Sequence, residues 1–176
     1  MANFSFGQNV TLHSFTHTVS YNPATCLADW VQWQCDTLMW GKADRKKISR
    51  FAEDWRVPKP RAKHSDYTKS GYDRGHLCPA ADFSLNITLM KETFVLSNVA
   101  PMTPKLNRGP WKVTEDSTRV LARRFGKVDV IVYTFFQPSD TSRLRRSCVA
   151  IPYSFAKVVC AAGSDSILAE WHLTNE

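Results

Sequence analysis

Three short stretches of the chain carry side chains suited to chemistry on a phosphate ester. The first is Asp73-Arg74-Gly75-His76. An imidazole can take up a proton near neutral pH, and a guanidinium offers a fork of donors that suits phosphate oxygens. The glycine between them permits an unusual backbone angle or a close approach. An exposed turn with incidental charges has the same composition, so this motif alone is weak.

The other two stretches supply Asn98, Asn107 and Glu115, in that order. Hydrolysis of a phosphodiester needs a base for water, neutralisation of charge on phosphorus and help for the leaving oxygen. His76 suits the base. Asn107 suits a single direct ligand for Mg²⁺, which keeps several of its waters, and Glu115 suits the orientation of those waters. We therefore predict a strand–strand–helix finger that holds one metal between His76 and Asn107.

Each of these residues also has an ordinary structural interpretation. Asparagine commonly caps a turn or a helix, which accounts for Asn98 and Asn107. Glu115 suits the first turn of a helix, and a lone histidine or arginine is usually a surface or packing residue. The occurrence of all of them together, in this order, favours the catalytic interpretation.

Length and charge limit the class of protein. A chain of 176 residues is expected to form one domain, residues 1–176, with a real core. The formal net charge of +7 favours polyanionic partners. No apolar run approaches the ~20 residues that cross a bilayer, and no signal peptide is visible. Basic residues concentrate before His76: Arg45, Lys46, Lys47, Arg50, Arg56, Lys59, Arg61, Lys63, Lys69 and Arg74.

The five cysteines are Cys26, Cys35, Cys78, Cys148 and Cys160, and the odd count leaves at least one thiol unpaired within the chain. None forms a close C-x-x-C pair, which argues against zinc. A bridge between Cys26 and Cys35, or between Cys148 and Cys160, and buried free thiols both remain open. His13 and His17 are expected at the surface, since their stretch does not look helical.

The spacing of apolar residues and the positions of proline and glycine predict the helices and strands that must position the site. A helix is expected over 109–125, begun by Pro110 and stopped by Gly126, with Arg119, Arg123 and Arg124 on its solvated side. The segment 42–70 is expected to be a long functional loop. The segments 100–105 and 137–146 are expected to be a turn and a polar loop. Expected strands are 10–21, 29–35, 94–99, 127–136, 166–173, and a hairpin of 148–152 with 155–160.

The three stretches together resemble the DNA/RNA non-specific endonuclease family, which uses a ββα-metal (His-Me) finger. Weaker similarity extends from about residue 13 to residue 173. The resemblance implies an α+β fold with a mixed, largely antiparallel sheet and that finger. The motifs that carry it are Asp73-Arg74-Gly75-His76, Leu96-Ser97-Asn98-Val99-Ala100-Pro101 and Leu106-Asn107-Arg108-Gly109-x-Trp111-x-x-x-Glu115.

The resemblance also implies roles for individual residues. His76 matches the general base, Asn107 the direct Mg²⁺ ligand and Glu115 the residue that holds water on the metal. Arg74 matches a residue that stabilises the phosphate in the transition state, and Asn98 a polar residue that supports the site. Phosphate contacts are expected from Arg50, Arg74 and Arg108. Mn²⁺ or another divalent cation is an expected substitute for Mg²⁺.

As its activity, the resemblance implies sequence-independent cleavage of DNA and RNA to 5′-phosphate and 3′-hydroxyl ends. The chain departs from the family pattern at Cys78, Met102 and Pro110, none of which removes a group that the mechanism needs. An inactive nucleic-acid-binding protein on the same fold is the alternative. A toxin or defence effector paired with a protein inhibitor would use the same chemistry. The resemblance favours a secreted, periplasmic or organellar location, and both a monomer and a homodimer remain open.

Overall fold

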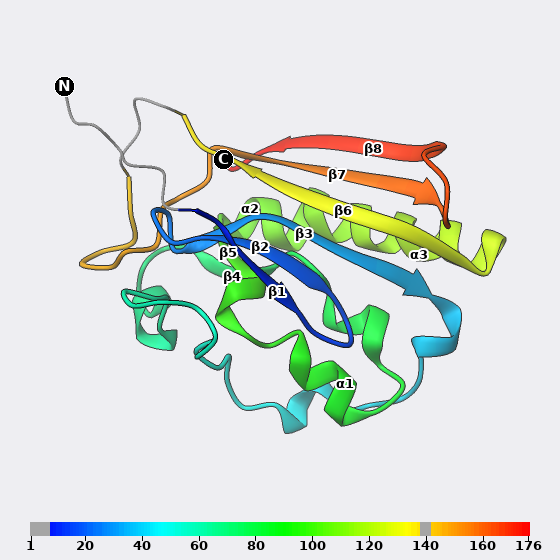
Figure 1. Ribbon diagram of the computed structural model, residues 1–176, viewed down its shortest axis with the longest axis horizontal. Helices are drawn as coiled ribbons and strands as arrows, with labels where there is room; N and C mark the ends of the chain where they lie inside the picture. Colours follow the sequence, from blue (N-terminus) through cyan, green and yellow to red (C-terminus); the bar gives the residue numbers. More distant parts are fainter. Residues whose placement is uncertain (1–7, 138–141) are drawn as a thin grey trace.

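The fold is built on a six-stranded, fully antiparallel sheet (Figure 1). The computed structural model describes residues 8–137 and 142–176. The strand order is β1-β2-β3-β6-β7-β8. The strands are β1 (Val10–His13), β2 (Thr18–Asn22), β3 (Leu27–Asp36), β6 (Lys127–Phe135), β7 (Ser154–Ala161) and β8 (Ile167–Thr174). The predicted α+β class with a largely antiparallel sheet is confirmed.

A second, two-stranded antiparallel sheet lies beside the first and belongs to the predicted finger. It pairs β4 (Asp73–His76) with β5 (Val99–Met102). Helix α1 (Ile87–Glu92) lies between them in sequence, whereas α2 (Pro104–Leu106) leads through one π-helical turn into α3 (Lys112–Phe125). Because α3 packs against β3, β6 and β7, it fixes the finger to the large sheet.

The alternation of side chains along the strands explains which face of the large sheet meets α3. In β6, Val128, Val130 and Val132 are buried, and the residues between them are less so. Apolar side chains at every second position cover one face of a sheet. Helix α3 ends at Gly126, whose φ of +82° is readily adopted by glycine alone. The predicted end of the helix is therefore correct.

The segment 10–21 was expected to be one strand, and this is wrong. It forms the hairpin of β1 and β2, closed by a turn in which the Ser14 hydroxyl donates to the carbonyl of His17 at 2.9 Å. His17 was expected at the surface and is instead 3% exposed. Its Nδ1 lies 2.8 Å from the Thr16 hydroxyl. The turn folds the ring inward, which alternation over a continuous strand could not indicate.

The expected strand 94–99 and turn 100–105 are also displaced. Residues Leu96–Asn98 form a 3₁₀ turn, and the strand follows as β5. Pro101 argued against a strand because proline cannot donate to a sheet ladder. However, β5 pairs only with β4 among the described residues, so no partner on the other side requires that N–H.

The predicted hairpin of 148–152 with 155–160 is wrong as well. Strand β7 pairs with β6 and β8, whereas the amide of Ala150 donates to the carbonyl of Thr25 at 2.9 Å. Pro152 lies just before β7, which begins at Ser154, so residues 148–152 do not continue into that strand. The expected loop 137–146 lies partly outside the described residues, since positions 138–141 are not described.

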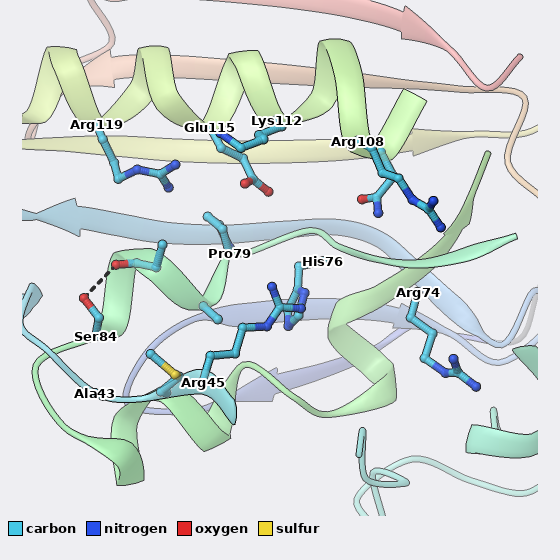
Figure 2. Close-up of a pocket in the computed structure, with 14 residues that line it drawn as sticks. Ala43, Arg45, Arg74, His76, Pro79, Ser84, Arg108, Lys112, Glu115 and Arg119 are labelled. Carbon is cyan, nitrogen blue, oxygen red and sulfur yellow. Dashed lines mark hydrogen bonds between the residues drawn. The ribbon is translucent and has the colours of Figure 1, made fainter. Parts of the chain in front are cut away.

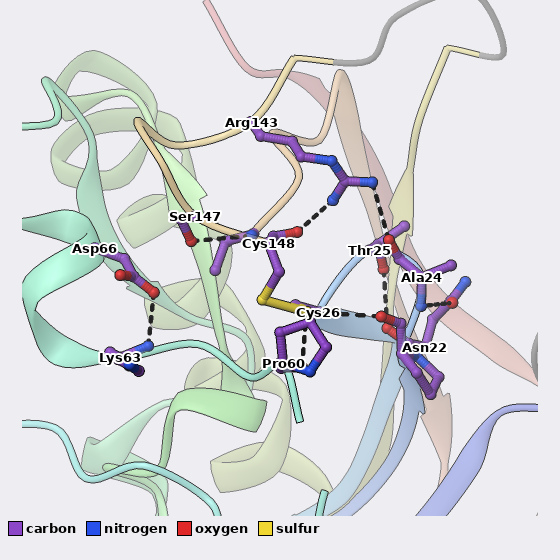
Figure 3. Close-up of a disulfide and its surroundings, with 12 residues drawn as sticks. Asn22, Ala24, Thr25, Cys26, Pro60, Lys63, Asp66, Arg143, Ser147 and Cys148 are labelled. Carbon is purple, nitrogen blue, oxygen red and sulfur yellow. Dashed lines mark hydrogen bonds between the residues drawn. A yellow bond between two sulfur atoms is a disulfide. The ribbon is translucent and has the colours of Figure 1, made fainter. Parts of the chain in front are cut away.

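A disulfide joins Cys26 to Cys148, which is neither of the two pairings left open by the sequence (Figure 3). Strand β3 separates Cys26 from Cys35, and β7 carries Cys160 away from Cys148, so the sequence neighbours cannot meet. Arg143 donates hydrogen bonds to the carbonyls of Cys148 and Ala24 beside the bridge. The bridge ties the turn before β3 to the segment before β7.

Loss of this bridge is expected to destabilise the fold. A native disulfide typically contributes about 2–4 kcal/mol, and the contribution grows with the length of the closed loop; the bridged cysteines are 122 residues apart. Cys148→Ser should therefore lower the unfolding free energy by about that amount in urea titrations. Cys160→Ser, at a half-buried free thiol, is the matched control. Equal stability of the two variants under oxidising conditions would contradict the assignment of this bridge.

Candidate active site

A cavity of about 550 Å³ opens between β4, the start of α3 and the segment that follows β3 (Figure 2). Its walls gather residues from segments that are far apart in the sequence. The charged and polar residues that line it are Arg45, Arg74, His76, Ser84, Asn107, Arg108, Lys112, Glu115 and Arg119. Five of the seven residues predicted for the site (Arg74, His76, Asn107, Arg108 and Glu115) therefore share one cavity.

His76 ends β4 with its ring held between two aromatic side chains. The ring centroids lie 4.8 Å from Phe51 and 4.7 Å from Phe94, the latter edge-on. The indole N–H of Trp111 donates to the carbonyl of His76 at 3.0 Å. These contacts fix both the ring and the backbone of His76, which is 8% exposed.

The imidazole of His76 is kept neutral. Burial lowers its pKa to about 3, and the charge of Arg45 acts in the same direction. Neither ring nitrogen of His76 has a hydrogen-bond partner within residues 8–137 and 142–176. Nε2 is fully buried, whereas Nδ1 is not. Nδ1 is therefore the nitrogen with access to the cavity. A neutral imidazole with a free nitrogen in a polar cavity can accept a proton.

Asn107 is oriented by Asp73, at the start of β4. The Asn107 Nδ2 donates to Asp73 Oδ2 at 3.0 Å, and Arg108 donates twice to the same carboxylate at 2.8 Å. These bonds lower the pKa of Asp73, mainly through Arg108. A carboxylate only accepts, so the amide oxygen must face away from Asp73. This Oδ1 has no hydrogen-bond partner in the described part of the chain and is available to a cation.

Glu115 presents its carboxylate to the same cavity two helical turns after Asn107 (Figure 2). Burial raises its pKa, while Lys157 and Arg119 act in the opposite direction. Its oxygens accept no hydrogen bond from the residues that the structure describes. Glu115 can therefore bind water or a hydrated cation without giving up an existing partner.

Lys157 is a buried cation beneath this wall of the cavity, and it was not singled out from the sequence. Its Nζ donates to the Thr114 hydroxyl at 2.9 Å and lies 4.1 Å from the centre of the Trp111 ring. Burial lowers its pKa to about 8. Trp111 donates to the carbonyl of His76, so Lys157 supports His76 through this ring. Its charge also acts on Glu115, whose pKa it lowers.

The remaining predicted residues lie at the edge of the cavity or outside it. Arg74 lines the edge and donates to the carbonyl of His64 at 2.7 Å. Arg50 lines a smaller hollow instead. Asn98 is fully buried. Its Oδ1 accepts from the amide of Cys78, and its Nδ2 donates to the carbonyls of Cys78 and Thr93. Asn98 is therefore placed to hold the chain after His76 rather than to touch a substrate.

Arg119 was expected on the solvated side of α3, and this is wrong. Its side chain is 16% exposed and donates to Asp82 at 3.0 Å and to Asp116 at 2.6 Å. Asp82 is fully buried and requires a cation or donors. Arg45 also enters the cavity without having been assigned a role, although it belongs to the basic run noted in the sequence. Lys112 at the rim is paired with Asp116.

The donor set in the cavity suits a cation that needs few protein ligands. No cluster of three or more His, Cys, Asp or Glu side chains that could hold a metal is found in the described residues, which argues against a closed zinc site. Mg²⁺ prefers oxygen ligands and keeps several waters. The amide oxygen of Asn107 and the carboxylate of Glu115, neither of which accepts a hydrogen bond from a described residue, fit such an ion. The two strands, the helix and these side chains together define a ββα finger.

The chain belongs to the DNA/RNA non-specific endonuclease family, whose model matches residues 2–175. It is 33% identical over 172 residues to human mitochondrial endonuclease G, covering 91% of this chain and 58% of the relative. It is 32% identical to nuclease C1 of Cunninghamella echinulata var. echinulata, covering 92% and 70%. It is also 40% identical to a nuclease of Syncephalastrum racemosum, covering 79% and 45%.

Solved structures agree with the fold. A chain in a crystal structure of the EndoG/EndoGI complex, described as showing the mechanism of EndoG inhibition, superposes with a TM-score of 0.85. The two sequences are 26% identical, and the match covers 97% of this chain and 76% of the other. The chain spans 58% of human endonuclease G and 45% of the Syncephalastrum nuclease, so it corresponds to part of these relatives.

Proposed function

We propose that this chain is a Mg²⁺-dependent, sugar-nonspecific endonuclease that cleaves DNA and RNA to 5′-phosphate and 3′-hydroxyl ends. The observation that carries the proposal is the shared cavity of His76 and Asn107. It combines a neutral imidazole that has no hydrogen-bond partner in residues 8–137 and 142–176 with an amide oxygen that Asp73 turns away from itself. Membership of the family and the names of the relatives support the same reaction.

In this mechanism His76 accepts the proton of the attacking water at Nδ1, the nitrogen with access to the cavity. Phe51 and Phe94 hold the ring in place, so little reorientation is needed during the reaction. Arg74 and Arg45 line the cavity with His76 and neutralise charge on the phosphate as it develops. Arg108 would bind a flanking phosphate. Its guanidinium is paired with Asp73, but the side chain is 71% exposed and can be reached by a substrate.

A divalent cation fits the opposite side of the cavity. Asn107 Oδ1 would be its direct protein ligand, and Glu115 would accept hydrogen bonds from the surrounding waters. When bound, the cation supplies charge neutralisation on the phosphate and assistance to the leaving oxygen. Mn²⁺ is expected to substitute, because oxygen ligands of this kind suit both ions.

Removal of the metal tests the proposal. The purified protein should degrade plasmid DNA and total RNA in Mg²⁺, and excess EDTA should reduce both rates by about 10³-fold or more, since the cation supplies several kcal/mol of transition-state stabilisation. Restored Mg²⁺ should recover the activity. Binding of nucleic acid without cleavage in Mg²⁺, Mn²⁺, Ca²⁺ or Zn²⁺ would contradict the proposal and favour an inactive binding protein on the same fold.

The proposal takes residues 1–176 as one endonuclease domain, because one core cluster includes residues of both the large sheet and the finger. A protein inhibitor is a proposed partner, by analogy with the EndoG/EndoGI complex. An exported or organellar location is proposed: several relatives are mitochondrial nucleases, and the Cys26–Cys148 bridge suits an oxidising compartment. No helix in the described residues has the length and hydropathy to cross a membrane.

A further inference from the structure

A second, smaller hollow is lined in part by Phe51, whose ring contacts His76. Its volume is about 290 Å³. Phe51 connects the two spaces, because its ring contacts His76 and the residue also lines the hollow. Arg74 connects them too, since it lines the cavity and donates to the carbonyl of His64. The hollow is lined by Arg50, Phe51, Ala52, Glu53, Trp55 and His64.

Trp55 is presented to solvent on this hollow and is 73% exposed. The guanidinium of Arg61 lies over its ring, 4.5 Å from the centroid. One face of the indole is thus supported by a cation, and the high exposure leaves the other face open. Single exposed apolar residues are common on proteins, but an indole stacked on arginine beside a catalytic cavity is a more specific arrangement.

The chain that carries Trp55 is anchored on both sides. The backbone of Ala52 pairs with Phe94 and Leu96, at 2.8 and 2.9 Å. Asp54 is 5% exposed and accepts from the Ser97 hydroxyl at 2.6 Å and from Arg56. These bonds join the turn to the segment before β5. The backbone that carries Trp55 is therefore anchored to the segment before β5, which also carries Phe94 beside His76.

We propose that Trp55 stacks on an unpaired nucleobase next to the scissile phosphate, while Arg50 binds an adjoining phosphate. This inference rests on the proposed nuclease function and names its preferred substrate class, single-stranded DNA or RNA. Aromatic side chains bind bases of single strands through their faces, with little sequence preference, and arginine adds to the stack. Glu53 in the same hollow repels phosphate and accepts N–H groups, which favours the base rather than the backbone at this position.

Duplex nucleic acid cannot use this surface without opening, because its bases are already stacked and paired. The basic residues around the cavity attract both forms through phosphate, with no need for an unpaired base. Trp55 should therefore contribute to the affinity for single strands and contribute little to the affinity for duplexes. This difference separates stacking from general electrostatic attraction.

The test measures binding in EDTA, where hydrolysis does not interfere. Fluorescence anisotropy gives Kd for a labelled thymidine 12-mer, for the same 12-mer with abasic sites, and for a blunt 12-bp duplex. Trp55→Ala should raise Kd for the thymidine strand by about 5- to 140-fold, and Trp55→Phe by much less. The duplex Kd should change by less than twofold. The abasic strand should bind wild type and Trp55→Ala equally.

Phe135→Ala is the matched control, since Phe135 is an exposed aromatic at the end of β6 in the large sheet. It should leave all three Kd values unchanged. Equal losses for strand and duplex in Trp55→Ala, a loss for the abasic strand, or no binding by the wild type would each overturn the inference. Cleavage in Mg²⁺ is measured separately. If the wild type cleaves but Trp55→Ala changes Kd for strand and duplex alike, the stacking alone is overturned. If Trp55→Ala weakens binding of the single strand only but the wild type does not cleave, the nuclease function alone is overturned.

Discussion

His76→Ala is expected to reduce the turnover of DNA and RNA by about 10²- to 10⁴-fold, the usual contribution of a general base. Among the described residues, His76 carries the only imidazole that lines the cavity, and alanine removes it. It leaves the arginines that attract the phosphate backbone, so Kd for nucleic acid should change by less than about threefold. Single-turnover cleavage of a labelled oligonucleotide and anisotropy in EDTA measure the two quantities separately.

A matched control separates catalysis from folding in this experiment. His172, on β8, is exposed and paired with Glu170, so His172→Ala should retain wild-type turnover. His76 also packs against Phe51 and Phe94, and His76→Ala leaves a small gap there. Thermal melting should therefore accompany the rates. Turnover by folded His76→Ala within threefold of the wild type would show that another group is the base.

The finger is the part of the structure that the sequence predicted best. Its first strand, its helix and the shared placement of His76 and Asn107 follow from three short motifs, within each of which local geometry positions the side chains. The order of the two strands and the long helix was correct even where boundaries moved, although α1 between the strands was not predicted. At β5 the proline is tolerated because β5 pairs only with β4 among the described residues.

Contacts between distant segments were not predictable in the same way. Nothing in the spacing of the cysteines selects the Cys26–Cys148 pair, which forms because two turns meet in space. Arg119 was misplaced because a polar helical residue is normally solvated, whereas the buried Asp82 draws it inward. Lys157 did carry a signal, since it alternates with Phe155 and Val159 on the buried face of β7. A lysine at such a position indicates a buried cation with a supporting role.

The orientation of Asn107 by Asp73 leads to a second large effect, which concerns the metal. Asn107→Ala removes the proposed direct ligand, so the loss of activity should exceed the 10- to 100-fold typical of a partner that merely orients a ligand. Added Mg²⁺ should not recover it. Asp73→Asn instead keeps Asn107 but removes the carboxylate that turns its oxygen outward. This variant should need 10- to 100-fold more Mg²⁺ for half-maximal activity and approach wild-type turnover when the ion is saturating.

Arg108→Ala decides whether this shift comes from the amide or from the ion pair. Arg108 donates to the same carboxylate as Asn107, so its removal breaks the ion pair and leaves the bond between Asp73 and Asn107 in place. It should weaken substrate binding without moving the Mg²⁺ midpoint. If Arg108→Ala moves the midpoint as far as Asp73→Asn does, the ion pair rather than the amide orientation sets metal affinity. If Asn107→Ala is rescued by Mg²⁺, the metal is held by Glu115 or by substrate phosphate, and Asn107 is not its ligand.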